Sequence, residues 1–291
     1  MLLVVPFYDY GYLQLFVPPT KIPLKLLMHS APLKLQPTFM SHATFWGMHA
    51  AIGLTGTLLL RPLQLSGLFS PRIEIWKRLL SIGLPSGGEF LIMAVYSAFV
   101  YSIIRDQGAD AQAGFGVGVR LMQSLFLPVM AVSFAASPLA AQNFGALKAA
   151  RVRETFRAAA IMAASLMLVM TILCHLSPDS LVKFFTSDPP VITYATDYLR
   201  IVSWGFLAFG LTFTSSAMFQ AMGNAWPGML SSVLRLLIFV FPALWLSHRP
   251  GFALTDLWYL AVAAGAAQCL FSLALLRREF TLRLAFASTA S

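Results

Sequence analysis

The sequence predicts an all-α polytopic membrane protein, and three observations lead to that fold class. Apolar residues make up 58% of the 291 positions and charged residues only 11%, whereas soluble domains carry roughly half and a quarter. The mean hydropathy is +0.75. The apolar residues gather in segments of about 20 residues, the length of helix that crosses the hydrocarbon core of a bilayer. A soluble globular domain, a disordered chain and a disulfide-rich secreted scaffold are therefore excluded.

Six strong apolar segments account for most of residues 80–276. None of them alternates apolar and polar residues with a period of two, as a barrel strand would, and unpaired backbone is too costly in lipid. We therefore expect a bundle of six transmembrane helices. The expected spans are 80–104, 113–137, 156–176, 199–222, 227–247 and 254–276.

The first 71 residues form a divergent or degraded N-terminal segment on this interpretation. A seventh, weaker apolar segment lies at 43–60, where histidines and glycines dilute the hydrophobicity. Upstream of it, residues 1–38 contain six prolines, which interrupt any long helix. No continuous apolar core with a small-residue cleavage site occurs there, so a signal peptide is not expected.

The formal net charge of +9 is best explained by membrane topology, because no compact basic run or RNA-binding signature is present. Loops rich in Lys and Arg stay on the cytoplasmic side. Ten basic residues fall on one side of the six spans: Arg72, Lys77, Arg78, Lys148, Arg151, Arg153, Arg157, Arg277, Arg278 and Arg283. Four fall on the other side: Arg105, Lys183, Arg200 and Arg249. The chain is thus expected to enter from the cytoplasm and to return its C-terminal tail, 281–291, to the cytoplasm.

Enzymatic chemistry is not indicated anywhere in the chain. The two cysteines, Cys174 and Cys269, lie in apolar segments without a zinc-binding spacing, and the five histidines are scattered. The metalloprotease, serine hydrolase and P-loop motifs are absent. We therefore expect no catalytic residue, no metal site and no cofactor, and neither an ATP-driven pump nor a nucleic-acid-binding protein.

Glu89 is the acidic residue that lies well inside a predicted span. A carboxylate in the membrane is a candidate functional group by default, since burying its charge costs several kcal/mol unless a partner or water compensates. Such a group is suited to taking up and releasing a proton or to holding a cation transiently. Glu89 is the predicted ion-coupling residue, with a structural ion pair to Arg120 on the next helix as the alternative.

Several further polar residues within or beside the spans are candidates for lining a substrate cavity. An adaptable cavity for an amphiphilic cation combines hydrogen-bonding groups with aromatic and Met side chains. Gly114 and Gly118, four residues apart, predict a close helix contact, as do Ala261 and Gly265. The cavity candidates are Tyr96, Tyr101, Arg120, Gln123, Gln220 and Arg235.

Four stretches resemble the C-terminal half of a bacterial multidrug and toxic compound extrusion (MATE) transporter. They are IGLPSGGEFLIM at 82–93, AGFGVGVRL at 113–121, SPLAAQNFGA at 137–146 and AMGNAWPGMLSSVLRLLIFVFPALWL at 221–246. The resemblance covers about 72–280, which we expect to be a MATE-like lobe of six helices. It implies a multi-pass protein of the inner (plasma) membrane.

The resemblance also implies a function. Family members export drugs and toxic organic cations in exchange for protons or sodium ions, using an acidic residue on the seventh of twelve helices, and Glu89 is the acid at that place. Twelve spans need well over 291 residues, so we expect a chain truncated or lacking its first lobe, which needs a second lobe or a homodimer for transport. A flippase of lipid-linked or polysaccharide intermediates and a non-transporting remnant or modulatory lobe are the alternatives.

Overall fold

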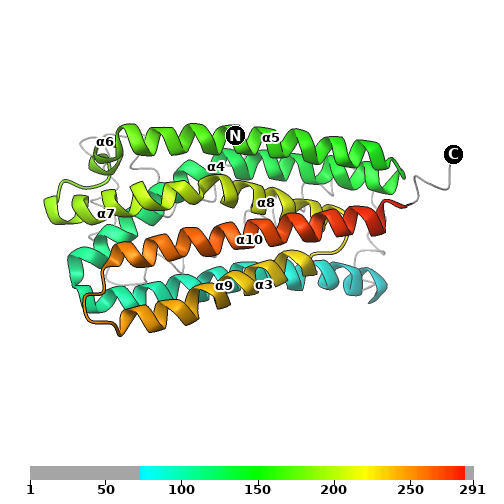
Figure 1. Ribbon diagram of the computed structural model, residues 1–291. Helices are drawn as coiled ribbons and strands as arrows, with labels where there is room; N and C mark the ends of the chain where they lie inside the picture. Colours follow the sequence, from blue (N-terminus) through cyan, green and yellow to red (C-terminus); the bar gives the residue numbers. More distant parts are fainter. Residues whose placement is uncertain (1–72, 286–291) are drawn as a thin grey trace, which may run out of the picture. The chain divides into compact units, whose positions relative to one another are not determined.

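The structure, a computed structural model, describes residues 73–285, and all of these belong to one compact unit that spans Arg72–Ser291. The weak apolar segment at 43–60 lies outside the described residues. The interpretation of 1–71 as a divergent N-terminal segment therefore stays a prediction. Within the described part the chain is helical, and Figure 1 shows long helices running side by side.

Six helical segments of the described chain are long and apolar enough to cross a membrane, as the sequence predicted. The fourth of these consists of α7, a single 3-10 turn (η5) and α8, which together run without interruption from Pro189 to Ala221. A short helix, α6, precedes it. The helices are α3 (Ile73–Ile104), α4 (Ala109–Gly145), α5 (Ala149–Leu176), α6 (Pro178–Lys183), α7 (Pro189–Val202), α8 (Phe206–Ala221), α9 (Trp226–Ser247) and α10 (Leu254–Arg283), with 3-10 turns η4 (Arg105–Gln107) and η5 (Ser203–Gly205).

Short turns connect consecutive spans of the described chain, and glycines with positive φ occur in three of them. Gly223 has φ of 77° between α8 and α9, and Gly251 has φ of 88° between α9 and α10. Residues with a Cβ rarely adopt this left-handed region, so glycine is the favoured residue at these positions. The short turns place α8, α9 and α10 antiparallel to one another in sequence order.

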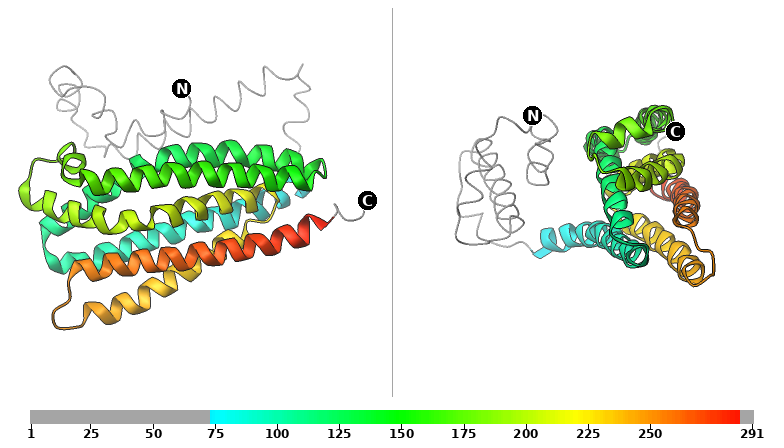
Figure 2. Two further views of the ribbon diagram at one scale, coloured as in Figure 1. Left: turned by 45° about the horizontal axis from the view of Figure 1, so that its top comes forward. Right: turned by 90° about the vertical axis from the view of Figure 1, so that its left-hand side faces the viewer.

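The helix α4 crosses the bundle from the side of α3 to the side of α5 (Figures 1 and 2). It packs mainly against α5, α7 and α8, while α3 packs mainly against α9. The close approach of α4 to α7 depends on small residues, because a Cβ on Gly118 would overlap the ring of Tyr198 and one on Gly114 would meet Tyr194. The predicted Gly114–Gly118 contact is thus confirmed, whereas a Cβ on Gly265 would meet no atom within 4 Å, so the close contact predicted at that glycine is not found.

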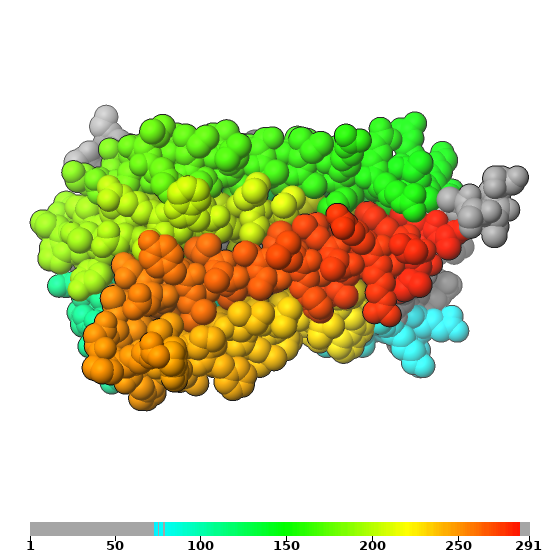
Figure 3. All heavy atoms as spheres, viewed as in Figure 1, coloured from blue at the N-terminus to red at the C-terminus, as the bar shows by residue number. Residues whose placement is uncertain are grey.

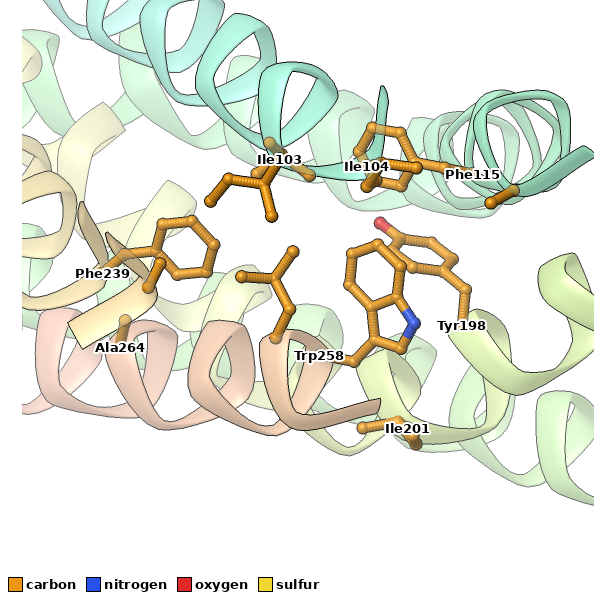
Figure 4. Packing of buried hydrophobic residues seen from close by; sticks show 12 residues of the cluster. Ile103, Ile104, Phe115, Tyr198, Ile201, Phe239, Trp258 and Ala264 are labelled. Atoms are coloured by element: carbon orange, nitrogen blue, oxygen red, sulfur yellow. The ribbon is translucent and has the colours of Figure 1, made fainter. Parts of the chain in front are cut away.

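An aromatic cluster fills the core where α3, α4, α7, α9 and α10 meet (Figure 4). The ring of Phe115 stacks on Trp258 with centroids 5.4 Å apart and meets Tyr198 edge-on at 5.3 Å. Tyr198 also meets Trp258 edge-on at 4.8 Å. Three long helices are fixed together here by dispersion contacts and favourable ring geometry.

The outside of the bundle is apolar, which agrees with a lipid environment. Large hydrophobic side chains are exposed on every long helix, for example Leu84 at 68%, Phe241 at 67% and Leu270 at 71%. A soluble monomer rarely exposes contiguous apolar surface on this scale. Figure 3 shows the face of the molecule on which α5, α7, α8, α9 and α10 lie side by side. The chain is therefore a multi-pass membrane protein.

Candidate functional site

Glu89 occupies the middle of α3, with 16 residues before it and 15 after it in the helix. Its carboxylate accepts hydrogen bonds from the hydroxyl of Ser216 on α8, whose Oγ lies 2.7 Å from both Oε1 and Oε2. The glutamate is half-buried and the serine is buried. The predicted ion-coupling carboxylate thus has a buried polar partner, Ser216, on a helix that the sequence did not connect with it.

The backbone of α9 lies against the Glu89–Ser216 pair, so three helices, α3, α8 and α9, form the site. A Cβ on Gly228 would overlap Oε1 of Glu89 and would lie 2.7 Å from Oγ of Ser216. Gly88 meets α9 in a similar way, since its Cβ would lie 2.8 Å from Sδ of Met229. The carboxylate therefore sits in a space that exists because residue 228 has no side chain.

Ser216 is an unusual member of the hydroxyl-rich segment TFTSS at 212–216 of α8. Thr212, Thr214 and Ser215 each donate to the backbone carbonyl four residues earlier, at 2.8–2.9 Å. This is the ordinary arrangement for hydroxyls within a helix. Ser216 instead donates across to another helix, so its hydroxyl serves the carboxylate and not its own helix.

This arrangement can exchange a proton or hold a small cation. A hydroxyl has one hydrogen to donate, so a carboxylate with four lone-pair positions retains accepting capacity after binding Ser216. The seryl oxygen also has lone pairs for a cation. Among residues 73–285 no group of three or more His, Cys, Asp or Glu side chains is arranged for a metal ion.

A second polar contact joins the same two helices seven residues further along each. Tyr96 follows Glu89 by seven positions on α3, and Arg235 follows Gly228 by seven on α9, which places each pair on one helix face. The guanidinium of Arg235 lies 4.7 Å from the ring centroid of Tyr96 and 5.1 Å from that of Phe209. Its Nε is buried without a hydrogen-bond partner. Glu89 and Arg235 thus belong to two polar layers of one interface, spaced about 10 Å along the helices.

The other cavity candidates lie apart from this interface. Arg120 and Gln123 are exposed on α4. Tyr101 is 37% exposed and packs edge-on against Phe115 at 4.8 Å, in the aromatic cluster. Gln220 is half-buried near the end of α8. The structure therefore brings together two of the predicted residues, Tyr96 and Arg235, and their roles in binding stay predictions.

Sequence reasoning missed Ser216 and Gly228. The signal for the first was the run of four hydroxyl residues between 212 and 216 in an otherwise apolar span. The signal for the second was a glycine two residues into a helix that begins at Trp226. Neither signal indicates which residue is contacted, because the contact between Ser216 and Glu89 joins positions 127 residues apart.

A sequence model described as MatE matches residues 85–246 of the chain, more than half of its length and including Glu89, Ser216 and Gly228. The chain is 26% identical over 194 residues to the multidrug export protein MepA of Staphylococcus haemolyticus, covering 66% of this chain and 42% of that protein. It is 24% identical over 184 residues to a probable multidrug resistance protein, NorM, of Thermotoga maritima, covering 63% and 38%. A protein of Shewanella oneidensis named as an FAD transporter is 24% identical over 208 residues, covering 69% and 45%.

Solved structures show the same fold. A MATE structure in the straight conformation superposes with a TM-score of 0.74 at 20% identity, covering 84% of this chain and 56% of that one. The outward-facing conformation of a multidrug resistance MATE family transporter gives 0.69 at 20% identity, covering 74% and 49%.

The chain spans less than half the length of these three curated relatives, whose alignments reach 38–45% of their residues. All three are named for export, resistance or transport, which supports the prediction that the chain is not an enzyme. Six apolar helices in the expected order, the glutamate in the first of them and the matching family model lead to one conclusion: the chain belongs to the MatE family of membrane proteins.

Proposed function

We propose that the chain is one lobe of a cation-coupled antiporter that exports drugs or toxic organic cations across the inner membrane. The observation that carries the proposal is the Glu89 carboxylate, held in the middle of α3 by Ser216 and accommodated by Gly228. Placing a carboxylate at such depth in the membrane costs a few kcal/mol. A carboxylate found there is therefore a candidate for a functional role. The names of MepA and NorM as multidrug proteins support the substrate class.

The coupling step follows from the chemistry of the site. Binding of a proton or a sodium ion to Glu89 removes its charge from the α3–α8–α9 interface. This change favours a different packing of these three helices, and an ion that favours one conformation over another shifts their equilibrium. Arg235 and Tyr96, in the second polar layer of the α3–α9 interface, are placed to respond to that repacking.

The proposal includes a second lobe. Transporters of this general kind move substrate by rocking two structural repeats about a site between them. Arg120 and Gln123, exposed on α4, are proposed to line the substrate cavity from this lobe. The partner is either a separate N-terminal lobe or a second copy of the chain. In this proposal the C-terminus of the lobe lies in the cytoplasm.

A second candidate is transport of an anionic amphiphile, such as a lipid-linked intermediate. Arg120, exposed on α4, favours it, because a cation within a long apolar helix suits an anionic substrate group. Two relatives point the same way: one is named as an FAD transporter, and a Pyrococcus furiosus transporter is described as having a binding pocket of reversed polarity.

Efflux in a pump-deficient bacterial host tests the first candidate. The chain is expressed alone and beside a separate N-terminal lobe of a MatE protein, and loss of ethidium from loaded cells is followed. We expect export with the second lobe present, none for Glu89→Gln, and partial export for Glu89→Asp. Glu74→Gln, near the start of α3, is the matched control and should export normally.

Normal ethidium export by the Glu89→Gln variant would contradict the role of this carboxylate. Failure of every pairing to export ethidium, with uptake or flipping of an anionic amphiphile that depends on Arg120, would favour the second candidate. A chain that inserts and pairs but moves neither compound would indicate the modulatory or remnant lobe.

A further inference from the structure

An open recess of about 380 Å³ lies between α5, α7 and α10, away from the Glu89 site. Its volume is within the range of about 300–1,000 Å³ typical of small-ligand pockets. The helices that form it lie on the face of the molecule shown in Figure 3. Its lining residues are His175, Asp197, Arg200, Ile201, Trp204, Thr255 and Tyr259.

The recess lies at one end of the bundle, at the level where a bilayer has its headgroups. His175 is in the last turn of α5, and Thr255 is the second residue of α10. Trp204 is 67% exposed and Tyr259 is 61% exposed. Exposed Trp and Tyr residues are typical of the membrane–water interface, where their rings contact acyl chains and their polar atoms contact water and headgroups.

Opposite charges stand side by side in the recess. Asp197 and Arg200 are three residues apart on α7 and therefore share a helix face. Nη2 of Arg200 is 3.9 Å from a carboxylate oxygen of Asp179, with both side chains 54% exposed. That distance is too long for a strong hydrogen bond, so the guanidinium keeps donors for a ligand.

His175 contributes by holding an aromatic wall in place. Its Nδ1 donates to the carbonyl of Thr171 at 2.9 Å, because a carbonyl oxygen only accepts. The imidazole ring then meets the ring of Trp204 edge-on, with centroids 4.7 Å apart. The ring of His175 on α5 thus packs against one side of the Trp204 indole, and the rest of the indole stays exposed.

We propose that this recess binds the headgroup of a zwitterionic phospholipid, phosphatidylethanolamine. Arg200 binds the phosphate, and Asp197 accepts hydrogen bonds from the primary ammonium, which also lies against the ring faces of Trp204 and Tyr259. Leu207 follows Trp204 by three residues and is 42% exposed, and it is the residue proposed to contact the acyl chains.

The pairing of charges distinguishes this headgroup from other lipids. A phosphatidylglycerol headgroup has the phosphate but no cation, so its binding leaves Asp197 beside an additional negative charge. A choline headgroup has a cation without N–H donors and forms no hydrogen bond with the carboxylate. The recess therefore favours the ethanolamine headgroup over both.

Native mass spectrometry of the purified chain tests the proposal by titration with phosphatidylethanolamine and phosphatidylglycerol of the same acyl chains. We expect the wild type to bind the first lipid roughly tenfold more tightly, about the effect of one charge-assisted hydrogen bond. Asp197→Asn should remove this preference, and Arg200→Gln should weaken both lipids. Asp188→Asn and Arg249→Gln, at the same end of the bundle, are the matched controls and should bind as the wild type does.

Equal affinity of the wild-type chain for the two lipids would overturn the proposal, as would a preference that both Asp197→Asn and Arg200→Gln retain. A competition with soluble glycerophosphoethanolamine separates a lipid from a free headgroup compound. We expect no displacement at equimolar concentration, since the soluble compound has no acyl chains. Displacement would assign the recess to a soluble ligand instead. The substituted side chains are exposed, so each variant should keep the wild-type unfolding temperature.

Discussion

Ser216 on α8 holds Glu89 on α3 through a hydroxyl that lies 2.7 Å from both carboxylate oxygens. The two residues are 127 positions apart in the sequence, and their helices both pack against α9 and α4. Because Ser216 lies on α8 and Gly228 on α9, the charge of the Glu89 carboxylate depends on contacts from three helices and not on α3 alone. A change of charge at Glu89 therefore acts directly on the packing of the lobe.

Ser216→Ala should destabilise the folded lobe by about 1 kcal/mol, because the half-buried carboxylate of Glu89 loses the donor that stabilises it. Ser215→Ala is the matched control and should have little effect, because that hydroxyl donates only to the carbonyl of Leu211 in its own helix. Unfolding in mixed micelles measures both values. Equal destabilisation by the two variants would mean that the bond to Glu89 contributes nothing specific.

Gly228→Ala should cost about 1–3 kcal/mol, since the added methyl group overlaps the carboxylate of Glu89 and forces a shift. Gly87→Ala should be neutral or slightly stabilising, because its Cβ would meet no atom within 4 Å and alanine favours the helix. The same unfolding assay compares them. The cost of Gly228→Ala should fall sharply in a Glu89→Ala background, and its persistence there would locate the clash elsewhere.

Phe115→Ala should destabilise the lobe by about 1–3 kcal/mol. The side chain is 5% exposed between the rings of Tyr198 and Trp258, so its removal leaves a cavity. The value stays below that for a soluble core, because in a bilayer the reference environment is lipid and mainly packing is lost. Phe241→Ala, at a position 67% exposed on α9, should change stability little, and a similar loss for both would contradict the role of the cluster.

The orientation of the lobe is testable with topology reporters. From the ten-to-four bias of basic residues, fusions after Arg283 and within 148–153 should report cytoplasm, and a fusion at Asp188 should report periplasm. The two positions lie at opposite ends of the helices, since 148–153 covers the end of the α4–α5 connection and the first turn of α5, whereas Asp188 precedes α7. A periplasmic signal at 150 would reverse the orientation of the lobe.

Hydropathy was sufficient to predict the six spans but not their full lengths. The fourth span was expected to begin at 199 and begins at Pro189, because Asp197 and Arg200 lower the hydropathy of α7 while lying in the interfacial recess. Charge in an apolar segment was likewise sufficient to single out Glu89. The partners Ser216 and Gly228 were not predictable in the same way, since hydropathy does not say which face of one helix meets which face of another.

Arg120 illustrates the same difficulty. It lies on the predicted span that follows the span of Glu89, and this succession made an ion pair plausible. Succession in the sequence leaves the rotation about each helix axis and the choice of neighbouring helix undetermined. In the structure α3 packs mainly on α9, whereas α4 packs mainly on α5, α7 and α8. The carboxylate of Glu89 binds the hydroxyl of Ser216 on α8. Arg120 is exposed on α4.

That exposed surface leads to a prediction about sufficiency. Arg120 and Gln123 are exposed on α4, and placing a charged group at the centre of a membrane span costs about 3 kcal/mol on insertion scales. Association that covers this surface with a second lobe or a second copy removes the cost. We therefore expect the chain expressed alone either to be degraded or to crosslink as a homodimer or with a partner lobe, and to confer no drug resistance.

Site-specific crosslinking from position 123 on α4 measures this association, with position 168 on the exposed face of α5 as the matched control. Adducts should form from the first position and not from the second. Arg120→Leu should weaken the association, since it removes the charge that makes lipid exposure unfavourable. A monodisperse monomer that exports ethidium along an imposed proton or sodium gradient would contradict the prediction, because transport would then require no second lobe.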